Sequence, residues 1–142
     1  MAMFSKESLD SNVIAESLTA AAIEWKIDDD GDVYAKQGGI DFGVFIQLEK
    51  ERSKLRLMTY YQCKEGVDEG ELGKFVAALN KQYVLVKFTA TSYDDGRKYL
   101  NGFYDIYYNF GLDSALFLFT LRKFAAIFLE AVREDTDDVF FE

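Results

Sequence analysis

Apolar residues recur along this chain with two different periods, and the changes of period mark predicted helices and strands. The helical period applies to three segments: residues 8–22, residues 68–82 and the segment from Asp113 to Glu134. The alternating period of strands applies to six segments: residues 23–28, 32–37, 40–49, 54–63, 83–93 and 98–110. The order α-β-β-β-β-α-β-β-α predicts an α+β fold, with an antiparallel sheet and helices mainly on one face. The 142 residues are expected to form a single domain, residues 1–142.

Alternation also assigns the strand side chains to two opposite faces of the sheet. The face expected to meet the helices carries Phe42, Val44, Ile46, Leu48, Leu55, Leu57, Thr59, Tyr61, Leu100, Tyr104, Ile106, Tyr108 and Phe110. The opposite face carries Phe45, Met58, Tyr60, Tyr99, Phe103 and Tyr107, with Arg56 and Asp105 between them. A solvated sheet face is normally polar, whereas aromatic, Met and Arg side chains are enriched in protein interfaces. We therefore predict that the second set binds a partner, unless a helix or the chain end 139–142 covers it.

Charge narrows the range of partners. The chain has 16 basic and 25 acidic residues, a net charge of −9, which repels nucleic acid and anionic membranes. The acidic run that begins at Glu130 is typical of a solvated chain end. The apolar last helix is interrupted by Arg122 and Lys123, which argues against a membrane span. With no signal peptide and one cysteine, Cys63, the chain is expected in the cytoplasm.

The aspartate-rich stretch at residues 26–36 is the nearest thing to a metal-binding motif. Aligning Gly31 with the invariant glycine of a calcium-binding EF-hand puts Lys26 at the first position and Gln37 at the twelfth. The first is a cation, and the second lacks the bidentate carboxylate that the motif requires. Asp30-Gly31 instead favours a two-residue turn between strands. The stretch is therefore predicted to be structural, with no bound metal.

Other chemistry is sparse. The sequence contains no histidine, which removes the commonest general base and the His-dependent nucleophiles. A P-loop is also missing, since the glycines at 38, 39 and 43 have no lysine after them in the required spacing. Cys63 ends a predicted strand, where a small packed side chain is the ordinary interpretation. We predict that the protein is not an enzyme and needs no cofactor.

Several segments together resemble a known family. They are "ALN" at 78–80, "LVKFTA" at 85–90, the "DDG" turn at 94–96 and "FGLDSALFLFTLRKF" at 110–124. Over roughly residues 8–135 the chain is similar to the YbjN-type family of bacterial proteins, labelled sensory transduction regulators. The resemblance implies a fold like that of type III secretion chaperones. It also implies an acidic, often dimeric protein that binds other proteins, and it supplies no catalytic residues.

Two functions follow as hypotheses. The first is a non-enzymatic protein-binding module, chaperone-like or regulatory, that acts through an apolar sheet or helix surface and forms a homodimer. The alternative is a small-molecule sensor with a pocket between sheet and helices, lined by Trp25 and by Tyr and Phe side chains.

Overall fold

The computed structural model describes residues 3–141. The helices are α1 (Ser11–Ala20), α2 (Glu69–Gln82) and α3 (Ser114–Arg133). The strands of the main sheet are β2 (Glu24–Ile27), β3 (Val33–Gln37), β4 (Val44–Glu49), β5 (Lys54–Gln62), β6 (Lys87–Ser92) and β7 (Lys98–Tyr107). Two short strands, β1 (Met3–Phe4) and β8 (Leu112–Asp113), pair with each other. The predicted order α-β-β-β-β-α-β-β-α is confirmed, with this small pair added around it.

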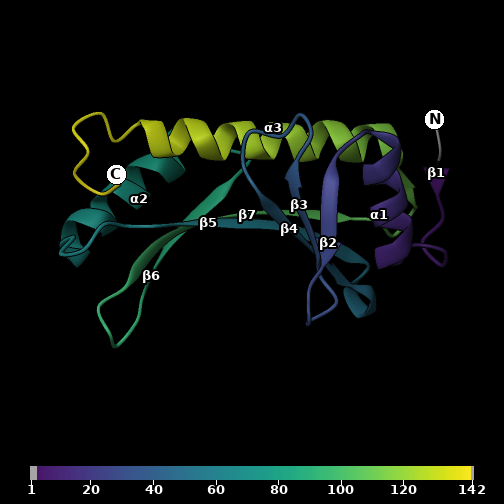
Figure 1. Cartoon of the computed structure of the whole chain (residues 1–142), viewed down its shortest axis with the longest axis horizontal. Coiled ribbons are helices and arrows are strands. Elements are labelled where there is room, and N and C mark those ends of the chain that lie inside the picture. The colour runs from purple at the N-terminus through teal and green to yellow at the C-terminus, as the bar shows by residue number, and fades with distance from the viewer. Residues whose placement is uncertain (1–2, 142) are drawn as a thin grey trace.

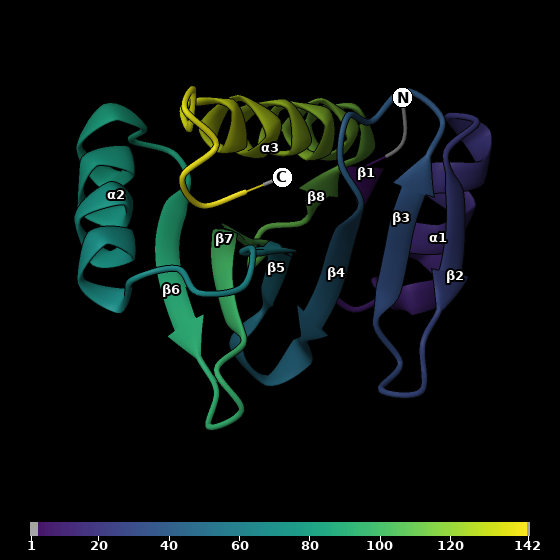
Figure 2. The same cartoon turned by 60° about the vertical axis from the view of Figure 1, so that its left-hand side comes forward.

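The main sheet is antiparallel, in the order β2-β3-β4-β5-β7-β6 (Figure 2). Successive hairpins build β2 to β5, α2 then carries the chain to β6, and β7 returns between β5 and β6. Helix α3 lies along one face of the sheet (Figure 1), where it contacts β5. Helix α1 packs against β2 and β3, and α2 packs against β6 at the other end.

The core lies between α3 and the sheet face that the alternation predicted to meet the helices. Val44, Ile46, Leu55 and Leu57 are all fully buried there. From α3 the buried side chains are Phe117, Leu121, Phe124, Ala125, Phe128 and Ala131. Helix α3 approaches β7 closely at Gly102, where a Cβ atom would lie 2.7 Å from Cδ1 of Phe128. Glycine at this position therefore lets the ring of Phe128 rest directly on the strand.

Aspartate side chains set the helix starts. Asp10, Asp68 and Asp113 each occupy an N-cap and accept a hydrogen bond from a backbone N–H in the first turn. Such caps satisfy donors that have no partner inside the helix. The cap at Asp10 explains why α1 begins at Ser11 and not at residue 8. The prediction of Asp113 as the start of the last helix is confirmed.

The two Asp-Asp-Gly turns share one geometry, which differs from the predicted two-residue turn. Gly31 N–H donates to the Asp28 carbonyl over 3.0 Å, and Gly96 N–H donates to the Tyr93 carbonyl over 2.9 Å. Both glycines have positive φ, +84° and +90°, while the aspartates before them do not. A two-residue type I′ turn needs positive φ at both central residues. The loops are therefore three-residue turns closed by a left-handed glycine.

Strand β6 starts four residues later than the alternation predicts. The N–H of Tyr83 still donates to the carbonyl of Leu79, so the chain leaves α2 only at this residue. Residues 83–86 then form an irregular link in which Val84 and Leu85 are exposed and Val86 is buried. Asn80 fixes the beginning of the strand, since its side-chain amide donates to the Phe88 carbonyl and its oxygen accepts from the Phe88 N–H.

One further expectation is wrong and another holds only in part: Glu130, Glu134, Asp137 and Asp138 are exposed as predicted, but Asp135 is buried. Phe110 was assigned to the core, but β7 ends at Tyr107 and Phe110 lies fully exposed in the following turn. The acidic chain end is not simply solvated. The Asp135 carboxylate is buried and accepts hydrogen bonds from the N–H groups of Val139, Phe140 and Phe141, at 2.9–3.0 Å. These bonds fold the chain back so that Phe140 and Phe141 are buried.

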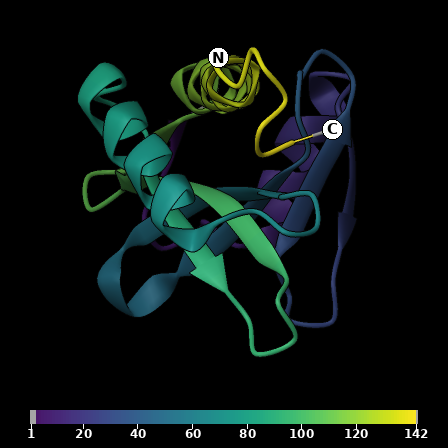
Figure 3. The same cartoon turned by 90° about the vertical axis from the view of Figure 1, so that its left-hand side faces the viewer.

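The folded-back segment after α3 lies on the helix side of the sheet (Figure 3). The ring of Phe141 contacts Tyr61, an inner-face residue of β5, with centroids 5.3 Å apart. Phe140 packs on Phe75 of α2 at 4.8 Å. The chain end therefore fills the gap between α2 and α3 and leaves the opposite sheet face open. None of the helices between residues 3 and 141 is long and apolar enough to span a bilayer.

Candidate functional site

The outer sheet face, opposite α3, carries a row of residues that crosses all strands of the main sheet. Directly paired residues in antiparallel strands project to the same face. The pairings connect, in order, Lys26, Tyr34, Phe45, Met58, Phe103 and Lys87. The row is aromatic and apolar in the middle and has a lysine at each end. This arrangement follows from the strand order and cannot be seen in the linear sequence.

The structure places all the predicted partner-binding residues on this outer face. Tyr60 is 46% exposed and Tyr107 is 64% exposed. Phe45, Met58, Tyr99 and Phe103 are partly exposed. Five of the residues adjoin one another, whereas Tyr107 lies apart from them, beyond the Arg56–Asp105 pair. Neither the helices nor the chain end 139–141 covers the set.

Ring contacts join the aromatic residues into one chain. Tyr34 lies 4.6 Å from Phe45, Phe45 stacks on Tyr60 at 5.9 Å, and Tyr60 meets Tyr99 edge-on at 5.6 Å. Tyr93, at the start of the β6–β7 turn, extends the chain by meeting Tyr99 at 5.6 Å. Such contacts hold the rings in place before any partner binds. We call Tyr34, Phe45, Met58, Tyr60, Tyr93, Tyr99 and Phe103 the aromatic sheet face.

Tyr34 and Tyr93 were not among the predicted residues. Tyr34 was detectable from the alternation, because its neighbours Val33 and Ala35 are the apolar inward residues of that strand. Tyr93 follows the last residue of β6, where alternation no longer assigns a face. Its place depends on the turn that closes at Gly96.

Two shallow hollows lie along β7 at the aromatic sheet face. The first, of about 390 Å³, is lined by Met58, Tyr60, Tyr93, Arg97, Tyr99 and Asn101. The second, also of about 390 Å³, is lined by Arg56, Leu85, Lys87, Thr89, Phe103, Tyr104 and Asp105. Each hollow therefore combines aromatic rings with at least one cationic side chain. Arg97 lies over the ring of Tyr93 at 5.3 Å, and Arg56 lies over Phe103 at 5.0 Å.

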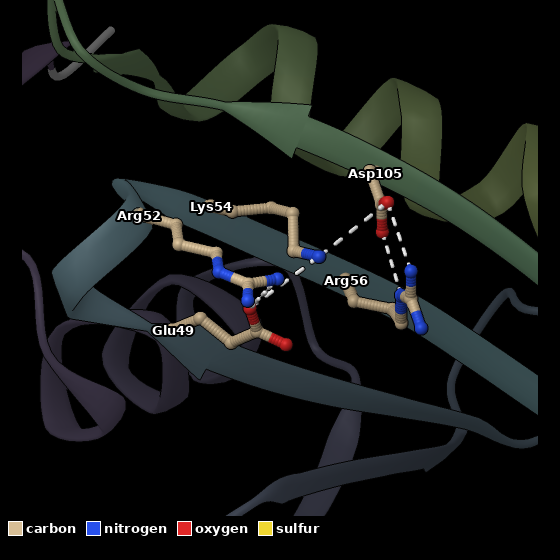
Figure 4. A network of polar contacts seen from close by, with 5 residues as sticks. All are labelled: Glu49, Arg52, Lys54, Arg56 and Asp105. Carbon is tan, nitrogen blue, oxygen red and sulfur yellow. Dashed lines mark hydrogen bonds and ion pairs between the residues drawn. The ribbon is translucent and has the colours of Figure 1, made fainter.

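A polar network borders the second hollow (Figure 4). Arg56 donates two hydrogen bonds to the Asp105 carboxylate, at 2.7 and 3.0 Å. The buried ammonium of Lys54 lies 3.4 Å from Glu49 and 3.7 Å from Asp105. Hydrogen bonding from Arg56 is the main cause that lowers the pKa of Asp105, while partial burial opposes it. The network keeps Asp105 ionised and fixes Arg56 above the ring of Phe103.

Asp105→Asn is expected to lower the free energy of unfolding by about 1–2 kcal/mol at pH 7, because Arg56 loses a charged acceptor. Since the folded pKa of Asp105 is depressed, this stabilisation is complete above the unfolded pKa of about 3.9. It is lost as pH falls through the lower folded pKa. Urea unfolding of wild type and variant from pH 7 to pH 2.5 measures the difference in unfolding free energy at each pH.

A matched control for this network is Asp95→Asn, which breaks the fully exposed Asp95–Arg97 pair at a turn. Its unfolding free energy should change much less, since water screens such pairs. A difference between Asp105→Asn and wild type that persists unchanged at pH 2.5 would contradict the assigned role of the Asp105 charge.

The aspartate turn at 28–32 brings the carboxylates of Asp28, Asp30 and Asp32 within 4.8 Å of one another. The Asp28 carboxylate accepts hydrogen bonds from the backbone N–H groups of Asp30 and Asp32, both at 3.0 Å. Burial, and then the negative charge of Asp28, raise the pKa of Asp32. The local hydrogen bonds explain the aspartates as supports of the turn between β2 and β3.

None of the five main pockets in the described part of the chain is lined by Trp25. Trp25 lies on the edge strand β2, is 37% exposed, and donates its indole N–H to the Thr19 hydroxyl at 2.8 Å. A pocket does lie between α3 and residues 85–86, but it measures only about 80 Å³. Small-molecule sites are typically about 300–1,000 Å³. Burial raises the pKa of the Cys63 thiol, which disfavours its reactive thiolate form.

Comparison with protein families gives a match over residues 10–139, to the YbjN family, "Putative bacterial sensory transduction regulator". This chain belongs to the YbjN family. Among solved structures, the chain is similar to one described as "Crystal structure of YbjN, a putative transcription regulator from E. coli". The match has a TM-score of 0.76 and 12% identity, and covers 92% of this chain and 94% of the other. A search of curated proteins finds no match.

At 12% identity, the similarity to the E. coli structure concerns the fold. The α+β architecture is thus shared by YbjN proteins of very different sequence. The family resemblance drawn from the sequence is confirmed. One of the segments that carried it, residues 78–80, contains Asn80, whose side chain bonds to both backbone groups of Phe88.

Proposed function

We propose that this YbjN protein is a non-enzymatic regulatory module that acts in the cytoplasm by binding another protein through the aromatic sheet face. The observation that carries the proposal is the uncovered row of apolar and aromatic side chains across the sheet. Large exposed apolar patches are uncommon on monomers and usually mark contacts. The ring contacts along the face also reduce the entropy that binding would cost.

The charge pattern of the face supports a different protein as partner over a second copy of the chain. Lys26 and Lys87 end the row on opposite edges of the sheet. When two sheets stack in a two-fold dimer with their rows parallel or antiparallel, each lysine lies near a lysine of the other copy. Like charges at an interface disfavour that pairing. A partner with acidic groups outside an apolar centre meets no such repulsion. The homodimer predicted from the sequence is the competing outcome.

The experiment compares two double variants. Tyr60→Ser with Phe103→Ser removes two rings from the aromatic sheet face, while Val84→Ser with Leu116→Ser removes two exposed apolar side chains elsewhere. A photo-crosslinking residue at position 45 reports contact with a partner in native cells. We expect both variants to stay folded by circular dichroism, and only the first to lose the crosslinked partner, by at least about tenfold.

Light scattering on the same samples distinguishes self-association from binding to another protein. A halved mass for the first variant alone identifies the partner as a second copy of the chain. If the crosslinked species and the mass are the same in both variants, the aromatic sheet face is not a binding surface and the proposal is wrong.

A further inference from the structure

Strand β7 is longer than β6, which pairs with it at the edge of the sheet. Its pairing with β6 runs from Lys98 to Phe103 and stops there, because β6 begins only at Lys87. Its pairing with β5 continues to Tyr107. Residues 104–107 therefore form an overhang with β5 on one side and no strand on the other. We call these residues the β7 overhang.

The backbone groups that face the open side of the overhang can be identified. The backbone carbonyl of Lys98 accepts from the N–H of Cys63, and the N–H of Tyr108 donates to the backbone carbonyl of Ser53. Even-numbered residues of β7 therefore direct their backbone groups toward β5. In an antiparallel strand the intervening residues direct theirs the other way. Asp105 and Tyr107 thus present their N–H and C=O groups to the open side. Between residues 3 and 141, no backbone or side-chain partner bonds to these groups on that side.

Two pockets border the overhang, one on each face of the sheet. On the helix side, the narrow pocket of about 80 Å³ is lined by Leu85, Val86, Tyr104, Phe119, Thr120, Lys123, Phe124 and Ile127. On the outer side lies the hollow with Arg56, Lys87, Phe103 and Asp105. Leu85 and Tyr104 line both. Leu85 and Phe119 are 58% and 65% exposed, so the entrance to the narrow pocket is apolar.

Charge differs between the two sides. The outer hollow has two cations, Arg56 and Lys87, against one carboxylate, Asp105. Within the described chain, neither Lys87 nor Lys123 has a carboxylate at ion-pair distance. An extended segment laid along the overhang would send alternate side chains to opposite faces. The helix side would take apolar side chains, and the outer side would take acidic ones.

We infer that the β7 overhang is a strand-addition site for an extended segment of another polypeptide with alternating apolar and acidic residues. The added strand continues the line of β6. It forms up to four backbone hydrogen bonds with Asp105 and Tyr107, while its apolar side chains contact Phe119 and Leu85. This mode of recognition takes affinity from backbone pairing and specificity from the pockets for alternate side chains. Of the aromatic sheet face, only Phe103 borders this site.

The test uses the full chain and a labelled synthetic peptide, Gly-Val-Glu-Val-Glu-Val-Gly. A version with lysine in place of both glutamates tests charge. A version N-methylated at the backbone nitrogens of both glutamates tests backbone pairing, because residues directly opposite Asp105 and Tyr107 point to the same outer face and exchange the backbone hydrogen bonds. Fluorescence anisotropy gives the affinity. Amide hydrogen exchange by NMR locates the peptide, and we expect new protection at Asp105 and Tyr107. The lysine and N-methylated peptides should bind at least about tenfold more weakly.

Matched variants separate the overhang from other surfaces. Phe119→Asp should weaken peptide binding by at least about tenfold, whereas Leu116→Asp, at a similarly exposed position on α3, should not. Lys87→Glu should weaken it, and Lys26→Glu, at the other end of the sheet, should not. Tyr60→Ser alters the aromatic sheet face outside the overhang and should leave binding unchanged, so failure of the proposed function would not affect this result.

Three outcomes would overturn the inference. The first is the absence of peptide binding up to about 1 mM, the weak limit of specific recognition. The second is protection that appears at β2 or on the outer side of β6 and not at Asp105 and Tyr107. The third is equal loss of binding in Phe119→Asp and Leu116→Asp, which would identify an unspecific apolar contact with α3.

Discussion

Phe128→Ala is expected to lower the free energy of unfolding by about 3–5 kcal/mol, the range for removing a buried ring from a core. The Phe128 side chain is fully buried. Its ring meets Phe42 at 4.8 Å and Phe88 at 6.2 Å, and it rests on Gly102 of β7. Truncation therefore leaves a cavity where α3, β6 and β7 meet, and the rigid strands around it cannot collapse to fill it. Urea unfolding followed by circular dichroism measures the loss.

Phe119→Ala is the control, since it makes the same chemical change on the same helix at a residue that is 65% exposed. Its effect should stay within about 0.5 kcal/mol. Equal losses for Phe119→Ala and Phe128→Ala would contradict the orientation of α3, because both rings would then have to be buried.

Asp135→Ala should destabilise the protein by about 2–4 kcal/mol, because the buried N–H groups of Phe140 and Phe141 and the part-buried N–H of Val139 lose the carboxylate that accepts from them. The loss should also release Phe140 and Phe141 from Phe75 and Tyr61. Thermal unfolding measures the destabilisation, and hydrogen exchange at residues 139–141 measures the release. Exchange there should speed up well before the rest of the protein unfolds.

The matched variant is Asp137→Ala, which removes an exposed carboxylate two residues away. It should change neither the melting temperature nor the exchange of residues 139–141. If Asp135→Ala leaves these amides as protected as in wild type, the carboxylate does not hold the chain end, and packing of the two rings alone accounts for it.

Much of the fold was predictable because local patterns determine it. Alternation identified Val44, Ile46, Leu55 and Leu57 as inward residues, and burial on one face requires that register. Asp113 marked the start of α3 because its cap is a local hydrogen bond. The exceptions depend on contacts between distant segments. Phe110 is apolar and continues the alternation, but β7 has already lost its neighbour at that point.

The candidate site was predictable only in part, for a related reason. Alternation assigns a residue to a face but does not say which strands are neighbours. Because β7 lies between β5 and β6, Phe103 adjoins Met58, and the predicted residues form one surface. The Arg56–Asp105 pair separates Tyr107 from that surface. The β7 overhang could not be predicted, since residues 83–86 were assigned to a strand from the sequence but form none.

The clasp between Asn80 and Phe88 has a consequence for solubility. An amide side chain presents one donor and one acceptor, the same pair that a neighbouring strand would offer. The Asn80 side chain, from α2, bonds to the N–H and the C=O of Phe88 and so covers part of the open edge of β6. An exposed edge strand has unpaired N–H and C=O groups, through which copies of a protein can pair edge to edge and aggregate. One asparagine thus helps a sheet with exposed rings to stay dispersed at high concentration.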